Sequence, residues 1–509
     1  MIIKKTIILI MVITLLSRIL GFVRELILAY MWGTSNIVDA YLVSLTIPGV
    51  IFGFVAAGIT AAFIPTYNKI LSNHDRDMTS RFTSNLTNII LLVTTVVLVL
   101  GLAFTEELVI ASASGFSQNT LKIGVEFTRI LLFSMYFSAI LSIFSAYLHA
   151  NNNFLAPAFI TIILNLINIA FIYISYIYGY IYLAVGYLLS IIFQVVYIIP
   201  HLKRSGYKHK LVVDFKDKYL GKCIGMALPV IIGVSVNKIN VLVDRTIASR
   251  ITVGGIASLN YAFRISDLIQ GLFVLSIITV IYPKISLLAQ ENRYMEFKKI
   301  FTGAVNSILF FTLPASIGLI IFSNKIIELL YGRGAFDNNS ILLTSGALRF
   351  YSVGLIGMAL REVVSRGFYA LDDSITPVKN AVIAVCLNII LNIVLSKYLG
   401  INGVALATSI AATFTTILLF ISLRKKIGPF GMKQISVSFL KILFASLVMG
   451  GLAKLSFNYL TSSLSQNISL LLAIGVGAVS YFIIIYFMKI EDVDVIVGAI
   501  KKKFGRGAA

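Results

Sequence analysis

Apolar stretches long enough to cross a bilayer as α-helices, about twenty residues or more, follow one another along almost the whole chain. Short polar connections separate them, so the pattern predicts an all-α polytopic membrane protein without a sizeable soluble domain. We predict fourteen transmembrane helices, at residues 5–32, 38–65, 83–105, 122–149, 155–178, 180–200, 221–249, 256–283, 300–322, 343–369, 377–397, 401–423, 436–460 and 468–489.

A weak internal repeat divides these helices into two groups. Tyr41 in the second predicted helix and Tyr261 in the eighth are 220 residues apart, as are Asn168 and Asn388. Two six-helix lobes related by a pseudo-twofold axis, with a cavity between them, produce such spacing in transporters. We therefore predict three parts: a first lobe at 1–200, a second lobe with its preceding cytoplasmic loop at 201–434, and two extra helices with a basic tail at 435–509.

The composition agrees with this class, because 58% of the residues are hydrophobic, only 12% are charged, and the mean hydropathy is +0.95. The net charge of +21 suggests nucleic acid as a partner, but the positions of the basic residues argue otherwise. They lie in alternate connections, near 69–81, 203–222, 284–299 and 424–433, and in the tail at 501–506. Basic residues mark cytoplasmic loops. We therefore predict that both termini are cytoplasmic and that no nucleic acid is bound.

Three charged residues lie inside the first predicted helix: Arg18, Arg24 and Glu25. An arginine at membrane depth costs about 2.5–3.5 kcal/mol on insertion scales, so such residues face water or a partner. Arginine also binds phosphate through a fork of donors. We therefore predict a transporter with a cationic central cavity for an anionic, phosphate-bearing substrate. The alternative is that Arg24 and Glu25 lie at the outer helix end beside Trp32.

Helical geometry constrains this hypothesis. Arg18 and Glu25 share one helix face, whereas Arg24 lies about 120° away. A bend or unwinding at Gly21 is one way to turn Arg24 toward the same cavity.

The seventh and eighth predicted helices also carry polar groups at membrane depth. Asn237, Asn240 and Asp244 share a face and suit a hard cation such as sodium, or a proton. Pairing of Asp244 with the adjacent Arg245 is the alternative. Arg264 and Asp267 are three residues apart and can form an ion pair, which either binds substrate or only fixes helix packing.

Other helices contribute further candidates. Asn388 and Asn392 lie one turn apart in the eleventh predicted helix, and Thr408 lies in the twelfth. Asparagines in membrane helices often only bond to neighbouring helices. Arg361, toward the cytoplasmic end of the tenth helix, is a candidate inner-gate residue. Asp39 begins the second helix, where it either caps that helix, which we favour, or serves as an outer-gate residue.

Six segments form an ordered set along the chain: SRILGFVRE (17–25), VDAYLVSLTIP (38–48), PHLKRSG (200–206), YAFRISD (261–267), YSVGLIG (351–357) and GFYALDDSITPVK (367–379). This set resembles the MurJ/MviN family of lipid II flippases, which belongs to the multidrug/oligosaccharidyl-lipid/polysaccharide exporter superfamily. The likeness covers essentially the whole chain and agrees with the count of fourteen helices.

The resemblance implies a substrate and a set of site residues. Lipid II is a polyprenyl diphosphate carrying a disaccharide-pentapeptide. The family moves it from the inner to the outer leaflet of the bacterial cytoplasmic membrane for peptidoglycan synthesis. The family's cavity residues correspond to Arg18, Arg24, Glu25 and Arg264, its outer aspartate to Asp39, and the sodium site of some members to Asp244, Asn388, Asn392, Val404 through its carbonyl, and Thr408.

Two positions depart from the family pattern. Phe52 stands where many members carry an arginine early in the second helix, so one contact to the diphosphate is missing or replaced. Asn392 stands where an aspartate is frequent. With one negative charge fewer, cation binding should be weaker, which puts sodium coupling in question.

We therefore expect a lipid II flippase that works by alternating access. It should need no cofactor, respond to the membrane potential and couple to sodium or protons. The expected partners are lipid II and the bilayer, and the expected state is a monomer. One alternative is another polysaccharide-lipid flippase or a drug/cation exporter of the same superfamily, although a cationic cavity disfavours cation export.

The other alternative is a membrane-embedded enzyme of lipid-linked glycan synthesis. Such an enzyme needs clustered acids or histidines at one interface, usually with a metal. The sequence has no HExxH motif, and its acidic pairs Asp75/Asp77 and Asp372/Asp373 are more simply explained as solvated turns. We therefore expect a transporter, not an enzyme.

Overall fold

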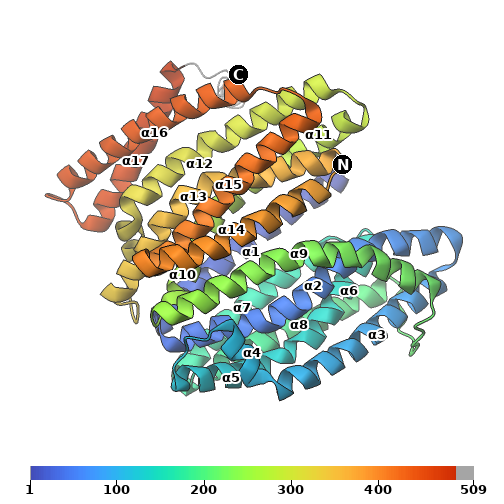
Figure 1. Cartoon of the computed structure of the whole chain (residues 1–509). Coiled ribbons are helices and arrows are strands. Elements are labelled where there is room, and N and C mark those ends of the chain that lie inside the picture. The colour runs from blue at the N-terminus through green and yellow to red at the C-terminus, as the bar shows by residue number, and fades with distance from the viewer. Residues whose placement is uncertain (1, 489–509) are drawn as a thin grey trace. The chain divides into compact units, whose positions relative to one another are not determined.

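The structure is a computed structural model in which residues 2–488 are described, apart from the side chains of a few residues in α1, α2 and α9. No residue in this range lies in a β-strand. The basic tail at 501–506 lies outside the described residues. The elements, shown in Figure 1, are α1 (Ile2–Trp32), α2 (Asn36–Asn73), α3 (Arg76–Ala103), α4 (Thr105–Ser112), α5 (Gln118–Leu132), α6 (Ser134–Ala150), α7 (Leu155–Tyr178), α8 (Tyr182–Arg204), α9 (Lys218–Ile251), α10 (Gly255–Ile269), the π-helical η1 (Gln270–Val274), α11 (Leu275–Gln290), α12 (Tyr294–Tyr331), α13 (Asn338–Ala370), α14 (Ile375–Leu399), α15 (Ile401–Ile427), α16 (Met432–Leu460) and α17 (Gln466–Phe487).

Thirteen helical segments in the described part of the chain are long and apolar enough to cross a membrane. They correspond to thirteen of the fourteen predicted helices. In two cases several elements form one segment: α5 with α6, and α10 with η1 and α11. The first predicted helix forms α1 but is not among the thirteen. The all-α polytopic class is therefore confirmed, while the count of fourteen is not.

The chain packs into two compact units, which are described separately. Unit 1 contains Met1–Ala257 and Arg333–Ser340, and unit 2 contains Ser258–Gly332 and Ile341–Ala509. The division of the chain at 1–200, 201–434 and 435–509 stays a prediction.

In unit 1, α2 packs most extensively on α9, and the two helices lie side by side in Figure 1. They are antiparallel. At one end the His74 ring nitrogen Nε2 lies 2.9 Å from the Tyr219 hydroxyl. Near the other end Arg245 donates a hydrogen bond to the Leu42 carbonyl. Between them Gly58 permits close approach, because a Cβ there would lie 2.8 Å from a side-chain carbon of Ile231.

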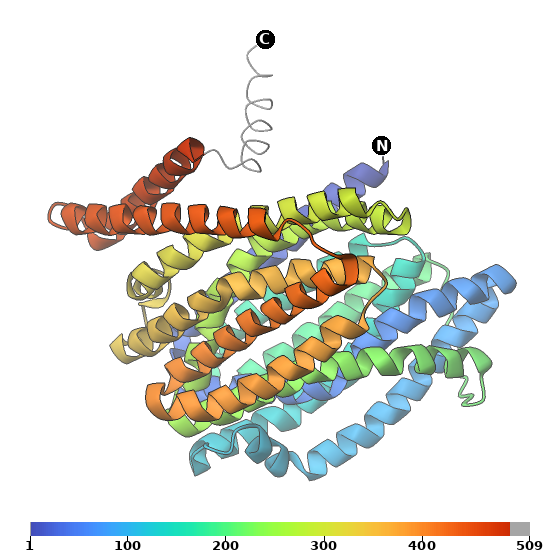
Figure 2. The same ribbon diagram turned by 45° about the horizontal axis from the view of Figure 1, so that its top comes forward.

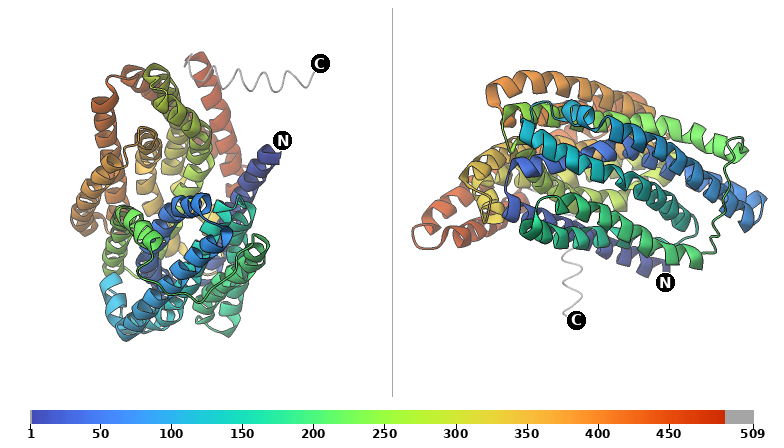
Figure 3. Two further views of the ribbon diagram at one scale, coloured as in Figure 1. Left: turned by 90° about the vertical axis from the view of Figure 1, so that its right-hand side faces the viewer. Right: turned by 90° about the horizontal axis from the view of Figure 1, so that it is seen from below.

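The connection between α8 and α9, green in Figure 3, passes beside α3. We call its residues 207–216 the linker strap. The Asn85 amide donates to the Asp214 carbonyl at 2.9 Å and accepts from the Asp214 N–H at 2.7 Å. One turn further along α3, the Asn88 amide donates to the Lys210 carbonyl at 3.1 Å. These asparagines satisfy strap backbone groups that form no regular secondary structure.

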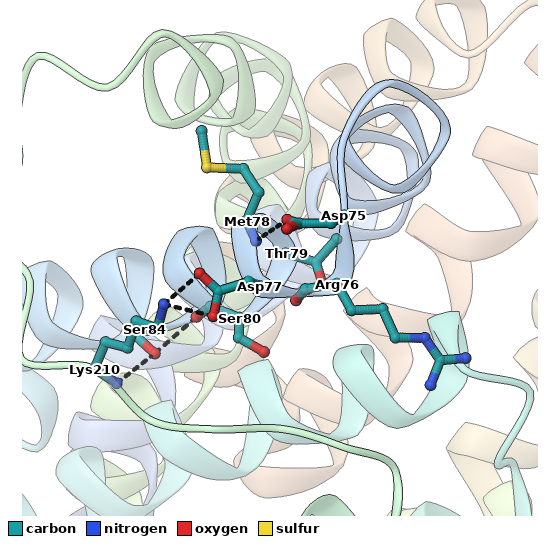
Figure 4. A network of polar contacts seen from close by, with 8 residues as sticks. All are labelled: Asp75, Arg76, Asp77, Met78, Thr79, Ser80, Ser84 and Lys210. Carbon is teal, nitrogen blue, oxygen red and sulfur yellow. Dashed lines mark hydrogen bonds and ion pairs between the residues drawn. The ribbon is translucent and has the colours of Figure 1, made fainter.

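Figure 4 shows how the strap is tied to the start of α3. The Lys210 N–H donates to the Ser84 hydroxyl at 3.0 Å, and its ammonium forms an ion pair with Asp77 at 2.5 Å. Asp75 is the N-cap of α3 and accepts from the Met78 N–H at 2.9 Å. The pair Asp75/Asp77 therefore serves a helix start and a loop contact, as the turn interpretation predicted.

Unit 2 is organised around α12, whose apolar side chains form much of the core with α11, α13 and α16. Figure 2 shows α16 and α17 as antiparallel neighbours. The Tyr481 hydroxyl of α17 donates to the Phe310 carbonyl of α12 at 2.7 Å. Between α14 and α15 the chain turns at Gly400, whose φ of +56° favours glycine. Gly403 then lies so close to the Leu395 carbonyl that a Cβ would be 2.2 Å from its oxygen.

Candidate functional site

An ion pair between neighbouring residues lies on α1. The Arg24 guanidinium donates to the Glu25 carboxylate at 2.7 Å. The Glu25 side chain is 3% exposed and the Arg24 side chain 20%. The Glu25 carboxylate is therefore buried and the Arg24 guanidinium half-buried, and the cavity position and the outer helix end both stay predictions. Tyr41 and Tyr187 are close enough to the guanidinium to interact with it electrostatically.

The helix α1 passes through Gly21 without interruption. Unwinding at Gly21 is therefore not what brings Arg24 into its position. Instead, Gly21 faces α7, where a Cβ on it would lie 3.6 Å from the Asn165 amide nitrogen. That amide donates to the Ser17 carbonyl at 3.0 Å. Arg18 is half-buried in the same stretch, and no hydrogen bond to it is found among the described residues.

Asp39 is buried, with 2% of its surface exposed. Its carboxylate accepts from the Gly254 N–H at 2.6 Å and the Ala257 N–H at 2.8 Å, at the first turn of α10. The prediction that Asp39 caps its own helix is wrong, because Ser35 is the N-cap of α2 and makes no side-chain cap bond. Asp39 caps α10 instead. Carboxylates are favourable there because the first N–H groups of a helix lack partners.

Four of the five predicted cation-site residues lie together in unit 2. The Asn392 amide donates to Asn388 Oδ1 at 2.7 Å, and the Asn388 amide lies 3.4 Å from the Thr408 hydroxyl. That hydroxyl donates to the Val404 carbonyl at 3.2 Å. The spacing of four residues within α14 and within α15 stacks these groups, and the turn at Gly400 brings the two helices together. Amide, hydroxyl and carbonyl oxygens suit a hard monovalent cation.

Asp244, the fifth predicted cation-site residue, belongs to unit 1, and its part in the site stays a prediction. The Asn240 amide donates to its carboxylate at 3.4 Å, in agreement with the shared helix face. Among the described residues no group of three or more histidines, cysteines, aspartates or glutamates could hold a metal ion.

The remaining predicted charges lie in unit 2. Arg264 is half-buried on α10, and the pair to Asp267 that the spacing allows is not among its described contacts. Arg361 is half-buried on α13. Asp373 belongs to the turn before α14, where it accepts from the Thr376 N–H at 2.9 Å and pairs with Lys426 at 2.7 Å. The turn interpretation of this aspartate is therefore confirmed.

The sequence predictions left out several charges inside apolar helices, of which Lys238 is the most central. Lys238 lies in the middle of α9, and its side chain is half-buried. A Cβ on Gly53 of α2 would lie 3.5 Å from its Cε and 3.9 Å from its ammonium nitrogen. The cost argument applied to Arg18 holds equally for a lysine inside an apolar helix, and it would have found this residue.

Membrane-length helices that carry an arginine–glutamate pair and a cluster of polar amides are typical of a membrane transporter. The family model described as "Lipid II flippase MurJ" matches residues 28–475. The chain belongs to this family.

Relatives and solved structures agree. A probable lipid II flippase MurJ of Buchnera aphidicola is 30% identical over 430 residues, covering 82% of this chain and 83% of the relative. A lipid II flippase MurJ of Burkholderia cenocepacia is 26% identical, covering 86% and 87%. The solved structure "Lipid II flippase MurJ, inward closed conformation" has a TM-score of 0.83 at 30% identity, covering 94% of this chain and 98% of its own.

A more distant likeness concerns the fold alone. An inward-facing multidrug resistance transporter of the MATE family, from the MOP superfamily, has a TM-score of 0.69 at 15% identity. It covers 82% of this chain and 98% of its own. The fold expected from the resemblance therefore agrees with this structure.

Proposed function

We propose that this protein moves lipid II from the inner to the outer leaflet of the cytoplasmic membrane by alternating access. The observation that carries the proposal is the enclosed Arg24–Glu25 pair within α1, in a chain of the lipid II flippase family. A guanidinium held inside a membrane protein is costly without a polar partner, and it fits a diphosphate. Glu25 fixes the orientation of Arg24 and lowers the cost of keeping it there.

In this proposal Arg24, Arg18 and Arg264 bind the diphosphate of lipid II. Asp39 contributes to the outer gate and Arg361 to the inner gate. The apolar tail of the substrate stays in the bilayer, along a groove made by α16 and α17. Both termini are cytoplasmic, in agreement with the basic connections, and the protein acts as a monomer.

The coupling ion is part of the same proposal. Asn388, Asn392, Thr408 and the Val404 carbonyl hold a sodium ion together with Asp244. The cluster of oxygen donors supports this, because sodium binds neutral and anionic oxygens. A proton on Asp244 is the alternative. The membrane potential returns the empty cationic cavity inward, at about 2.3 kcal/mol per unit charge and 100 mV.

The test is rescue of bacteria depleted of their own lipid II flippases. The wild-type protein should restore growth, and Arg24→Ala and Arg264→Ala should not, at equal membrane abundance. Arg293→Ala is a matched control, because this arginine is half-exposed between α11 and α12 and pairs with Glu291 and Glu296. Full growth with both Arg24 and Arg264 replaced rejects the proposed role of these arginines.

The MATE-like fold raises cation or drug export as a second candidate function. Efflux of a cationic dye from the same cells separates the two. Efflux without rescue of growth favours export, and rescue without efflux favours flipping.

A further inference from the structure

Lys238 places an ammonium group at membrane depth, and the ion pairs found among the described residues include none to it. It lies at the centre of the 34-residue helix α9. Within the described part of the chain, no hydrogen bond or ion pair reaches its side chain. The ammonium is also not sealed in apolar packing, because the side chain is only half-buried. A lysine in this setting needs water or an anion.

The apolar surroundings of Phe52 on α2 explain why a positive charge is supplied by Lys238 of α9 and not by an arginine at position 52. Phe52 is 5% exposed and lines an apolar cavity of about 210 Å³ with Ile59, Leu86 and Ile231. An arginine at position 52 would place its charge among these hydrocarbon side chains, which is unfavourable. The next residue, Gly53, has no side chain, and the lysine of α9 lies against it.

Two cations at membrane depth in unit 1, Arg24 and Lys238, differ in charge balance. Arg24 is neutralised by Glu25 at 2.7 Å. Lys238 has no such carboxylate among the described residues, so it brings a whole positive charge to any anion that reaches it. Lysine is a compact phosphate-binding charge on a flexible stem, which can follow a moving ligand.

We propose that Lys238 binds a phosphate of the lipid-linked substrate and takes the place of the arginine that the family resemblance predicts at Phe52. The inference rests on the proposed function, because it names a further contact to the same diphosphate. Because Gly53 has no side chain, the Lys238 ammonium can lie against α2 beside position 52. The positive charge of this subsite then comes from α9 and not from α2.

The first test compares charge variants in the depleted bacteria. Lys238→Met removes the charge at nearly constant volume and should abolish rescue at normal membrane abundance, whereas Lys238→Arg should retain it. Lys299→Met is the matched control, because Lys299 is an exposed lysine of another membrane-length helix, α12, to which no substrate contact is assigned. Wild-type growth of Lys238→Met, in cells where Arg24→Ala fails, overturns the inference and leaves the proposed function standing.

The second test moves the charge between helices. In the double variant Lys238→Ala, Gly53→Lys, the ammonium comes from α2 and the space vacated on α9 accommodates it. A Cβ at Gly53 meets the present lysine only at ordinary contact distance, so the substitution does not force the helices apart. Restored rescue supports binding by the charge itself. Failure of this variant, with membrane abundance and thermal stability equal to wild type, shows that a positive charge at this place is not what rescue requires and contradicts the inference.

The third test is direct binding of purified protein to lipid II in detergent. Loss of one charge-assisted contact should weaken the affinity of Lys238→Met by about tenfold or more. The salt dependence of binding should also become shallower. Equal affinity of wild type and Lys238→Met refutes the inference, whereas absence of lipid II binding by the wild-type protein refutes the proposed function instead.

Discussion

Asp39 provides the sharpest quantitative prediction, because one side chain holds two backbone donors of another helix. At a pH at which Asp39 is ionised, hydrogen bonds to its carboxylate each contribute about 1.5–3 kcal/mol. In Asp39→Asn, one oxygen still accepts, but the amide group opposes the second N–H. One hydrogen bond is lost and the other is weakened, so the free energy needed to open the first turn of α10 should fall by about 2–4 kcal/mol.

The assay is hydrogen–deuterium exchange of the purified protein, read at the amides of Gly254 and Ala257, which donate to Asp39. A loss of that size should speed exchange there by roughly 30- to 1000-fold, since about 1.4 kcal/mol corresponds to a factor of ten. Ser35→Ala is the control, because Ser35 makes no side-chain cap bond and its replacement should leave these amides unchanged. Unchanged exchange in Asp39→Asn would refute the reasoning.

Three further predictions follow from the described contacts. Asn85→Ala leaves the Asp214 backbone of the linker strap without its amide pair, and limited proteolysis should then cleave the strap at least tenfold faster; an unchanged rate contradicts the pairing. Burial alone raises the pKa of Asp373, but the hydrogen bonds from Lys426 and Thr376 outweigh it and lower that pKa to about 2. The resulting stability is present above the ordinary pKa near 3.8 and is lost as the pH falls toward 2. The difference in Tm between wild type and Lys426→Met should therefore shrink over this range, and a constant difference argues against the pair. Asn392→Asp adds a carboxylate to the amide cluster and should increase sodium affinity by tenfold or more in a calorimetric titration, while an unaltered affinity excludes the residue as a ligand.

The sequence predicted the all-α membrane class and picked out several polar residues inside the helices. Both predictions rest on the free energy of placing a residue in the bilayer, which depends on that residue and its neighbours in the sequence. Apolar length identifies a membrane helix, and a charge such as Arg18 inside it is conspicuous whatever the tertiary structure. The same local geometry placed Asn388 and Asn392 on one face, and the structure stacks them. Lys238 follows the same rule and could have been predicted.

Contacts between distant segments could not be predicted in this way. Asp39 looked like the cap of its own helix because N-cap preferences concern adjacent residues. Its donors lie more than two hundred residues away, at Gly254 and Ala257, and no local pattern points to them. Gly21 likewise suggested a bend or unwinding, whereas its helix is continuous and it lies against Asn165 of α7, a contact between distant segments.

The linker strap has a mechanical consequence. A connection of ten residues without regular secondary structure is normally flexible. This one is held against α3 by hydrogen bonds of two asparagine amides and by an ion pair. The strap ends just before Asp217, whose carboxylate caps α9, so no flexible residues separate the strap from that helix. If α9 tilts, the backbone must therefore bend at Asp217, or α3 must move together with α9.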